Sequence, residues 1–419
     1  MAYISRIQIE NCRNVQKLDV DLSVESDANS SEQRPIFKHL IFTGPNGSGK
    51  SGVLAAIAGC IGNTLSARPL KVVQTRPPGD GLGDVFLSLA QTNSPRVWFK
   101  WTTNTEFGAR PVSSVAPDIY EAKSRPTVIV YLPARGRLLG QNRVSGPQKL
   151  NLSAENNRVG EQLSPYWQQF LVNKHTDMTY AKADGDTQSA DRIEAWFNSL
   201  WAHIRNLMED RNLNIRYDRK SYTFVFKRGD GYEFDLNTLA DGHAAVFGLL
   251  AEIFLRIELI QNKKNDFSFE PEGIVIIDEI EAHLHLSLQE QILPLLTTLF
   301  PKLQFIVATH SPAVIASISG AVVYDLKKQI QIPSDEYRGI PYGVLMTEHF
   351  GISSDIDLDS TQKLLRLHEL AQKSQRSDEE NKEFDQMSKI LSSRSGVLAT
   401  EVWMIKEKLS ASSIQLAGE

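Results

Sequence analysis

The chain has 419 residues, which at roughly 100 to 200 residues per domain indicates two or three structural units. Hydrophobic residues make up 41% of the chain and charged residues 23%, which excludes wholesale disorder, a collagen-like repeat and a coiled-coil rod. The net charge of −5 argues against a protein that coats nucleic acid through its overall charge, although a local basic patch remains open.

The cysteine content and the hydropathy of the sequence indicate the cellular compartment in which the protein is expected. Only Cys12 and Cys60 are present, so a disulfide framework is not available and the usage fits a reducing cytosol. The longest apolar stretch, 243–260, contains acidic and basic side chains and lacks the roughly 18 uncharged residues of a membrane span. Polar residues interrupt the N-terminal stretch where a signal peptide has its apolar core. We therefore expect a cytoplasmic protein without a membrane partner.

Hydrophobic periodicity predicts the elements of the N-terminal half. Alternation predicts a hairpin, aliphatic runs predict buried strands, and apolar residues spaced three and four apart predict helices. In chain order these elements are a hairpin over 3–22, a strand over 37–43, a helix over 53–61, strands over 97–101 and 126–132, and a helix over 189–212.

The C-terminal half continues with the same signals. The unbroken aliphatic run 273–277 is typical of a central parallel strand buried on both faces. A capping box at Ser377–Glu380 marks the start of one helix. The predicted elements are strands over 214–217, 222–227 and 232–236, a helix over 244–260, strands over 273–277 and 304–308 separated by a helix over 286–300, and two or three helices within 361–409.

A phosphate-binding motif lies between the strand at 37–43 and the helix that follows it. Residues 44–51 read Gly-Pro-Asn-Gly-Ser-Gly-Lys-Ser and fit G-x-x-x-x-G-K-[ST] without a mismatch. The glycines let backbone N–H groups converge on phosphate oxygens, Lys50 would neutralise the β- and γ-phosphates, and Ser51 would bind Mg²⁺. The motif predicts a nucleoside triphosphate with Mg²⁺ and leaves open a kinase, a GTPase or an ATP-driven machine. The nucleotide-binding residues of the loop are Asn46, Gly47, Ser48, Gly49, Lys50 and Ser51.

Two acids follow the buried strand at 273–277. A strand end at the active edge of the sheet places Asp278 where it can hold Mg²⁺ and Glu279 where it can orient or deprotonate the attacking water. The alternative is an ordinary acid pair that opens a helix. The sequence contains no Asn-Lys-x-Asp motif for reading guanine, so a GTPase is disfavoured.

Two further segments suit phosphate chemistry. His310, at the end of the strand 304–308, can donate a hydrogen bond to the γ-phosphate, although a strand-terminal histidine on its own is more often structural. Leu239-Ala240-Asp241-Gly242-His243 opens the long helix, and the free N–H groups at Asp241 and Gly242 would suit a phosphate. The chain's own phosphate-binding loop does not need them, so a second subunit is implied.

Together these motifs resemble those of ABC-type ATPases in the branch that includes RecF and SMC proteins. Residues 9–15, Ile-Glu-Asn-Cys-Arg-Asn-Val, resemble the first strand and turn of that branch. Residues 278–285, Asp-Glu-Ile-Glu-Ala-His-Leu-His, are similar to the DEPE-x-HLHP form of OLD-like ATPases in bacterial anti-phage systems of the Septu, retron-associated and PARIS-like kinds, with Ile280 and Leu286 in place of Pro.

The resemblance implies an α/β fold of the ABC-type P-loop NTPases: a mixed central sheet with an antiparallel β-subdomain, a helical insertion and a C-terminal helical region. It implies a head-to-tail homodimer, or a larger even-numbered assembly, with ATP between the loop of one chain and Asp241–Gly242 of the other. Ala240 replaces the usual signature serine, so slow hydrolysis is expected. The Mg²⁺-sensing glutamine is not located, and Gln74 and Gln141 are candidates.

The expected domain division has four parts. They are an N-terminal part of the ATPase head (1–138), a basic and helical insertion (139–213), a C-terminal part of the head (214–330) and a helical region for partner or self-association (331–419). Apolar residues in the last region suit docking as well as they suit packing on the ATPase core. They are Leu364, Leu365, Leu367, Leu370, Val402, Trp403 and Ile405.

The leading functional hypothesis is an ATP-hydrolysing sensor or scaffold subunit of a bacterial anti-phage complex that works with a separate effector nuclease of HNH or Toprim type. The first alternative is a RecF-like repair ATPase that binds DNA directly, for which the basic segment Lys123 to Arg158 is a candidate. Arg135 and Arg137 within it could contact phosphate, nucleic acid or an acidic partner, or form a solvated basic face. A transporter ATPase subunit is a third. Asp355, Asp357 and Asp359 suggest a metal site, but such acids before a helix more often form a solvated loop and cap.

Overall fold

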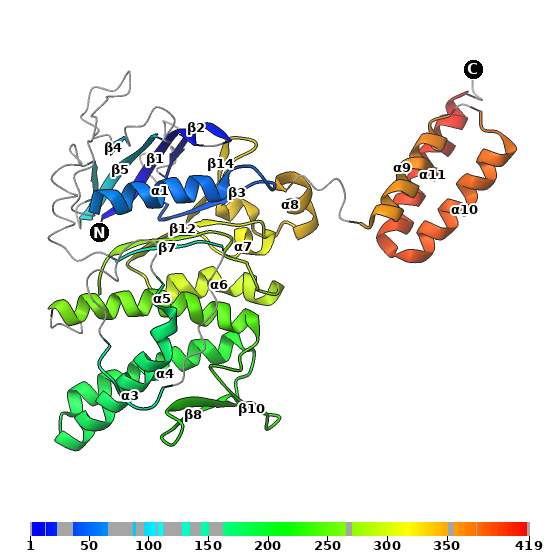
Figure 1. Ribbon diagram of the computed structural model, residues 1–419. Helices are drawn as coiled ribbons and strands as arrows, with labels where there is room; N and C mark the ends of the chain where they lie inside the picture. Colours follow the sequence, from blue (N-terminus) through cyan, green and yellow to red (C-terminus); the bar gives the residue numbers. More distant parts are fainter. Residues whose placement is uncertain are drawn as a thin grey trace. The chain divides into compact units, whose positions relative to one another are not determined.

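The computed structural model describes residues 2–12, 14–22, 37–65, 87–88, 96–105, 108–111, 128–134, 144–150, 162–264, 270–350, 356–373 and 375–416. The chain divides into two compact units, Met1–Tyr342 and Gly343–Glu419, shown in Figure 1. The division of the sequence into four parts remains a prediction. None of the helices in the described ranges combines the length and the apolar character that crossing a membrane requires.

A six-stranded sheet forms the centre of the first unit. Its order is β14 (Ile330–Pro333), β13 (Ala321–Asp325), β3 (His39–Thr43), β12 (Leu303–Ala308), β11 (Gly273–Ile277) and β7 (Val128–Leu132). All neighbouring pairs are parallel except β13 with β14. Every residue of β3, β11, β12 and β13 is buried, as expected for strands covered on both faces. The carboxyl ends of five strands therefore meet at one edge.

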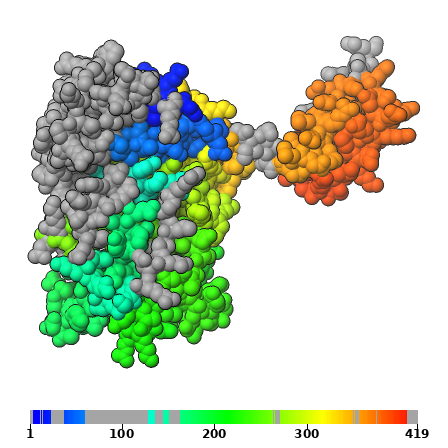
Figure 2. Space-filling model, viewed as in Figure 1, coloured from blue at the N-terminus to red at the C-terminus, as the bar shows by residue number. Residues whose placement is uncertain are grey.

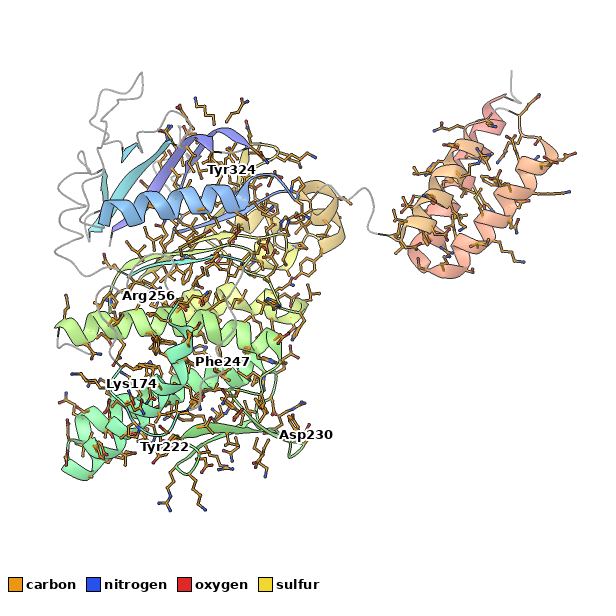
Figure 3. The ribbon with its side chains drawn as sticks, viewed as in Figure 1. Lys174, Tyr222, Asp230, Phe247, Arg256 and Tyr324 are labelled. Atoms are coloured by element: carbon orange, nitrogen blue, oxygen red, sulfur yellow. The ribbon has the colours of Figure 1, made fainter. Side chains whose placement is uncertain are left out.

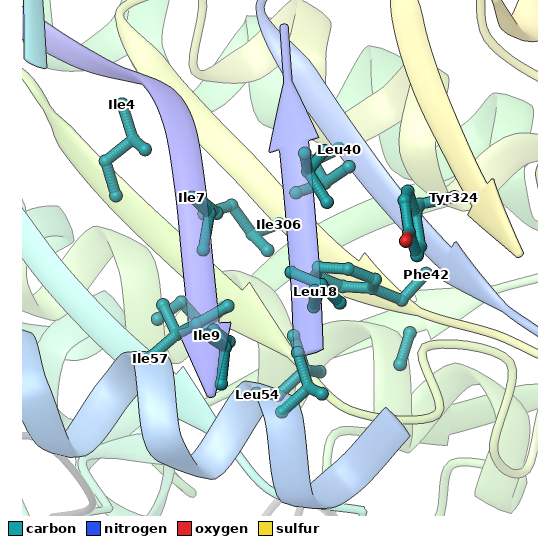
Figure 4. Close-up of a cluster of buried hydrophobic side chains, with 14 of the residues drawn as sticks. Ile4, Ile7, Ile9, Leu18, Leu40, Phe42, Leu54, Ile57, Ile306 and Tyr324 are labelled. Atoms are coloured by element: carbon teal, nitrogen blue, oxygen red, sulfur yellow. The ribbon is translucent and has the colours of Figure 1, made fainter. Parts of the chain in front are cut away.

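An antiparallel sheet and helix α1 (Lys50–Leu65) cover one face of the central sheet (Figure 1). The predicted hairpin is β1 (Ala2–Cys12) with β2 (Val15–Asp21), and it pairs onward with β5 (Arg96–Thr105), β4 (Leu87–Ser88) and β6 (Gly108–Pro111). Figure 4 shows Ile7 and Leu18 of this sheet in one apolar cluster with Phe42 of β3 and Leu54 of α1. The mixed sheet with its antiparallel subdomain agrees with the predicted ABC-type fold class.

Helices α5 (Asp241–Lys264) and α6 (Leu286–Leu299) lie on the opposite face of the central sheet (Figure 1). Beyond α5 lies an insertion that contains η2 (Ser164–Tyr166), α3 (Trp167–Asp184) and α4 (Thr187–Leu207), followed by the antiparallel strands β8 (Asn214–Asp218), β9 (Thr223–Lys227) and β10 (Glu233–Asp235). In Figure 2 the green atoms of this insertion lie at the end of the first unit away from the blue atoms of α1. The sequence patterns predicted α4 but not α3.

The insertion packs on α5 through aromatic rings and buried polar groups. Trp167 stacks on Phe254 of α5 with ring centroids 5.8 Å apart. The buried Glu252 carboxylate accepts the backbone N–H groups of Leu163 and Ser164, each at 2.7 Å. Figure 3 shows the side chains that fill this region, among them Lys174, Phe247 and Arg256. Trp196 of α4 also meets Phe254 edge to face, with ring centroids 5.4 Å apart, so the aromatic stripe of α4 is part of a packed core.

Short elements complete the first unit after β12. They are α7 (Pro312–Ala316), η3 (Ser334–Tyr337) and the start of α8 (Tyr342–His349), whose remainder belongs to the second unit.

The second unit ends in three helices, α9 (Leu358–Ala371), α10 (Asp378–Arg394) and α11 (Gly396–Leu416). The capping box at Ser377 and Glu380 is present, as predicted. Of the apolar residues singled out in the sequence, Leu367, Leu370, Val402 and Ile405 lie in the core between these helices, whereas Leu365 and Trp403 are each 60% exposed. Most of that apolar surface therefore packs within the unit itself.

Candidate nucleotide-binding site

The loop 44–51 leads from β3 into α1. Gly44, Gly47 and Gly49 have φ angles of 132°, 80° and 101°, a region that residues with side chains rarely adopt. A Cβ atom on Gly49 would lie 2.8 Å from Cγ2 of Val15 in β2, whereas nothing lies within 4 Å of a Cβ on Gly47. The loop therefore packs against the antiparallel sheet at Gly49 and leaves free space at Gly47.

The Lys50 ammonium group turns back into this loop. Nζ donates to the carbonyl oxygens of Gly44 at 2.8 Å and Pro45 at 3.1 Å, and lies 3.5 Å from Ser48 Oγ. Burial lowers the pKa of Lys50 to about 8, and nearby carboxylates, with Glu281 first among them, oppose that shift. At neutral pH the group remains mostly protonated and able to attract phosphate.

Asp278 and Glu279 follow β11 at the same edge of the sheet. Asp278 is 3% exposed, and its N–H donates to the Leu132 carbonyl at the end of β7 at 2.9 Å. Glu279 is partly exposed and has a φ of 48°, a left-handed conformation that is unfavourable for a residue with a side chain. Such backbone strain is often found at functional sites. Two carboxylates of different burial therefore lie at adjacent positions.

His310 follows β12, the strand that lies between β3 and β11. Burial, reinforced by the positive charge of Lys50, lowers the pKa of His310 to about 4, and the Asp278 carboxylate opposes this shift. These mutual charge effects agree with the strand order, which brings Lys50, Asp278 and His310 together. The imidazole is neutral at physiological pH and can still donate one hydrogen bond.

Glu281 is a residue of this site that the sequence motifs did not single out for a role. One carboxylate oxygen accepts the Thr309 hydroxyl at 2.8 Å, and the other accepts the N–H of His310. Burial raises the pKa of Glu281, and these hydrogen bonds oppose the rise. The available signal was the resemblance of residues 278–285 to the DEPE-x-HLHP form, in which Glu281 is the second glutamate. That resemblance does not indicate that Glu281 forms hydrogen bonds with the end of β12.

The predicted signature segment lies at the N-terminus of α5. Ala240 and Asp241 are exposed. A Cβ atom on Gly242 would lie 3.0 Å from the carbonyl oxygen of His283, so this glycine packs closely on the loop that follows Glu279. The rings of His243 and His285 meet edge to face with centroids 6.3 Å apart. The segment is thus braced by the loop after β11 of its own chain.

Several predicted residues lie outside the described ranges. They are Gln74, Gln141, Arg135, Arg137, Asp355 and all the basic residues of the segment Lys123 to Arg158 except Lys149, which is exposed. The side chain of Asp357 caps α9 by accepting the Ser360 N–H, and Asp359 pairs with Lys363 and Arg394. Among the described residues no cluster of His, Cys, Asp or Glu is arranged to hold a metal ion. The two described aspartates therefore act as a cap and an ion-pair partner.

The chain is similar in sequence to several known proteins. A family model described as "AAA domain, putative AbiEii toxin, Type IV TA system" matches residues 177–316. The Septu protein PtuA of Bacillus mycoides (strain KBAB4) is 25% identical over 364 residues, which is 84% of this chain and 45% of that protein. The "Retron Ec83 probable ATPase" of Escherichia coli is 40% identical over 89 residues, or 21% and 16% of the two chains. The chain is thus similar in sequence to Septu and retron proteins.

The mixed six-stranded sheet, the antiparallel subdomain and the glycine-rich loop before α1 have the arrangement expected of an ABC-type P-loop ATPase. The chain spans 16% to 62% of the lengths of four curated relatives that it matches. Among solved structures, the SMC head bound to the C-winged helix domain of ScpA aligns with a TM-score of 0.39 at 14% identity, over 80% of this chain and 98% of that one. The SMC head domain from Thermotoga maritima aligns with a TM-score of 0.37 at 14% identity, over 79% and 98%.

Proposed function

We propose that the chain binds and hydrolyses ATP as the sensor or scaffold subunit of a bacterial anti-phage defence complex. The observation that carries the proposal is the convergence of three strand ends. β3, β12 and β11 are neighbours and parallel, and they deliver Lys50, His310 and the pair Asp278–Glu279 to one edge of the sheet. A cation, a neutral hydrogen-bond donor and two carboxylates at one edge suit phosphoryl chemistry.

The loop fits a triphosphate on structural grounds. Gly47 leaves space above the loop, and Lys50 Nζ occupies the concave side formed by the Gly44 and Pro45 carbonyls. An arriving phosphate would draw the ammonium away from these carbonyls. Ser51 and Asp278 supply the hard oxygen ligands that Mg²⁺ prefers, and the bound ion would neutralise charge on the phosphate oxygens.

The chain's residues would divide the work of hydrolysis. A water oxygen attacks the γ-phosphorus, the bond to the bridging oxygen of ADP breaks, and the proton of the water passes to the Glu279 carboxylate. His310 would hold a γ-phosphate oxygen through one N–H while remaining neutral, since its pKa is about 4. Ala240 brings no hydroxyl to the signature segment, so we expect slow turnover.

We further propose that ATP joins two copies of the chain head to tail. Asp241 and Gly242 begin a helix of 24 residues, and its first N–H groups have no partner within the helix. The chain's own nucleotide contacts come from the loop 44–51 and the ends of β11 and β12. A second copy could bring its ATP to Gly242, and a larger even-numbered assembly could form in the same way.

The defence role and the partner rest on similarity. Septu and retron proteins are among the relatives, and the strong acidic and histidine motifs of the chain are already used in the ATP site. We therefore propose a separate effector nuclease of HNH or Toprim type and a cytoplasmic location. Purified alone with Mg²⁺ and ATP, the chain should leave plasmid DNA and RNA intact. Nuclease activity of the wild-type chain that disappeared when Asp355, Asp357 and Asp359 were all replaced would contradict this.

Two variants test the ATPase assignment. Lys50→Ala should lose nucleotide binding, whereas Glu279→Gln should bind ATP and stall before hydrolysis, as followed by fluorescent-nucleotide titration and phosphate release. Lys38→Ala is a matched control, because Lys38 also donates to a backbone carbonyl, that of Pro301, away from the loop. Phosphate release by Glu279→Gln at the wild-type rate would refute the role of Glu279.

Sedimentation tests the dimer. Glu279→Gln should sediment as a dimer or a larger even-numbered species in saturating ATP. Addition of Gly242→Asp should abolish this shift, because a second carboxylate would repel the phosphates and its Cβ atom would lie 3.0 Å from the His283 carbonyl oxygen. A species that stays monomeric in ATP would rule out the sandwich.

A further inference from the structure

Glu281 links two segments of the nucleotide site that are far apart in the sequence. It lies in the loop after β11, and its carboxylate receives the Thr309 hydroxyl at 2.8 Å and the N–H of His310, both at the end of β12. Next to it, the N–H of Ile280 donates to the Ala308 carbonyl at 3.1 Å. Three hydrogen bonds thus fasten the loop of Asp278–Glu279 to the histidine segment.

A second set of bonds extends this attachment into α6. Ser311 donates its hydroxyl to Gln289 Oε1 at 2.7 Å, and its N–H to Thr309 Oγ1 at 2.9 Å. Gln289 Nε2 in turn donates to the Leu284 carbonyl at 2.6 Å. The loop 280–284 and the segment 308–311 are therefore held at both ends, with Glu281 supplying the charged acceptor.

Two facts separate this role from ordinary packing. The acceptor is a carboxylate in a largely buried place, where an ion is retained only if hydrogen bonds and nearby cations compensate its desolvation. Glu281 is also the first of the carboxylates that oppose the lowering of the Lys50 pKa. Glu281 is thus oriented by the histidine segment on one side and lies within the charge field of the phosphate-binding lysine on the other.

We propose that Glu281 is a positioning residue for ATP hydrolysis, holding His310 in fixed relation to Glu279 so that both approach the γ-phosphate as one rigid unit. The proposal rests on the proposed function and gives the proposed reaction a residue to which the sequence motifs assigned no role. We expect Glu281 to affect hydrolysis more than nucleotide binding, because the loop 44–51 lies between β3 and α1. This loop is not part of the hydrogen-bonded clamp that joins residues 280–284 to residues 308–311.

The variants follow from the geometry. Glu281→Ala removes both acceptors and should lower kcat about 10- to 100-fold, because small misplacements of reacting groups cost up to roughly a hundredfold. Its Kd for nucleotide should change less than about threefold. Glu281→Gln keeps a carbonyl oxygen for the His310 N–H and should recover most of the rate, while Thr309→Val removes one bond and should fall between the two.

A matched control comes from α6. Glu290 accepts the Tyr342 hydroxyl at 2.7 Å, a bond like that of Thr309 to Glu281 but on the exposed side of the helix. Glu290→Ala should keep both kcat and Kd. Loss of nucleotide binding together with kcat in Glu281→Ala, or no rescue by Glu281→Gln, would show a merely structural role and overturn the proposal.

Hydrogen exchange read by mass spectrometry gives an answer that does not depend on hydrolysis. In Glu281→Ala the peptide that contains Thr309–Ser311 should exchange at least about tenfold faster, while the peptide that contains Gly44–Ser51 should be unchanged. Equal exchange in wild type and Glu281→Ala would refute the clamp. If wild type released no phosphate but the exchange difference were present, the proposed ATPase function would fail and the placement of His310 by Glu281 would stand.

Discussion

The buried ion pair in α5 offers a quantitative test of what joins the insertion to the signature helix. Glu252 and Arg256 lie one turn apart, 3% and 0% exposed, and form an ion pair. The same Glu252 carboxylate accepts the backbone N–H groups of Leu163 and Ser164 just before α3. We expect Glu252→Leu to be strongly destabilising, because it leaves a buried guanidinium and two amide donors without this acceptor.

The magnitude follows from the individual terms. Removing one member of a buried pair costs about 3 to 5 kcal/mol, and each amide left without an acceptor adds roughly 1 kcal/mol or more. Glu252→Leu should therefore lower the free energy of unfolding by at least about 5 kcal/mol. Arg256→Met should cost less, about 3 kcal/mol, because the carboxylate keeps both amide donors. The double variant removes both charges and should be at least about 2 kcal/mol more stable than Glu252→Leu alone.

Urea unfolding followed by tryptophan fluorescence measures these differences, with midpoints compared at unchanged slope. The exposed pair Lys182–Glu194, at 2.7 Å with each side chain 49% exposed, is the control, and Lys182→Met should change the free energy of unfolding by less than about 1 kcal/mol. A double variant no more stable than Glu252→Leu would refute the argument that the unpaired guanidinium carries most of the cost.

Two further predictions concern the central sheet. Gly273→Ala should lower the free energy of unfolding in urea by about 3 kcal/mol or more, because its Cβ atom would lie 2.0 Å from the Val128 carbonyl oxygen. The control Gly59→Ala in α1, with nothing within 4 Å of its Cβ atom, should raise it by up to about 1 kcal/mol. A Gly273→Ala protein as stable as wild type would contradict the close approach of the two strands. Burial lowers the pKa of His39 to about 3, so the unfolded chain takes up the proton first as the pH falls below 6.5, and the folded state loses stability. Between pH 6.5 and 5 the free energy of unfolding of the wild type should fall by roughly 2 kcal/mol more than that of His39→Asn. Equal losses in the two proteins would contradict this.

Local patterns predicted the elements that carry the nucleotide motifs. The aliphatic run 273–277 matches β11 residue for residue, because a strand buried on both faces needs no alternation. The strand before the loop 44–51 and the helix after it were also predicted, since glycines and a lysine at fixed spacing mark the junction. β13 (Ala321–Asp325) was missed, although it is a short apolar run bounded by Gly320 and two lysines.

What the sequence could not supply depends on contacts between distant segments. α3 has its buried apolar residues in its first turns and is polar after them, so the sequence shows only a weak helical repeat of apolar residues. Its place in the fold depends on packing against α5. The role of Glu281 depends on β12 lying next to β11, which no local pattern reports. The domain division and the roles of the individual site residues remain predictions that the variants above address.

The strand order also has a consequence for synthesis of the chain. β3 pairs only with β12 and β13 among the described strands, and these begin at Leu303 and Ala321. The first sheet partners of the phosphate-binding strand are thus made more than 250 residues after it. At roughly 5 to 20 residues per second, a ribosome would take about 15 to 60 s to produce them. During that interval the nascent chain carries a complete glycine-rich motif that has no sheet to hold it, so nucleotide capture has to wait until the last parallel strand has left the ribosome.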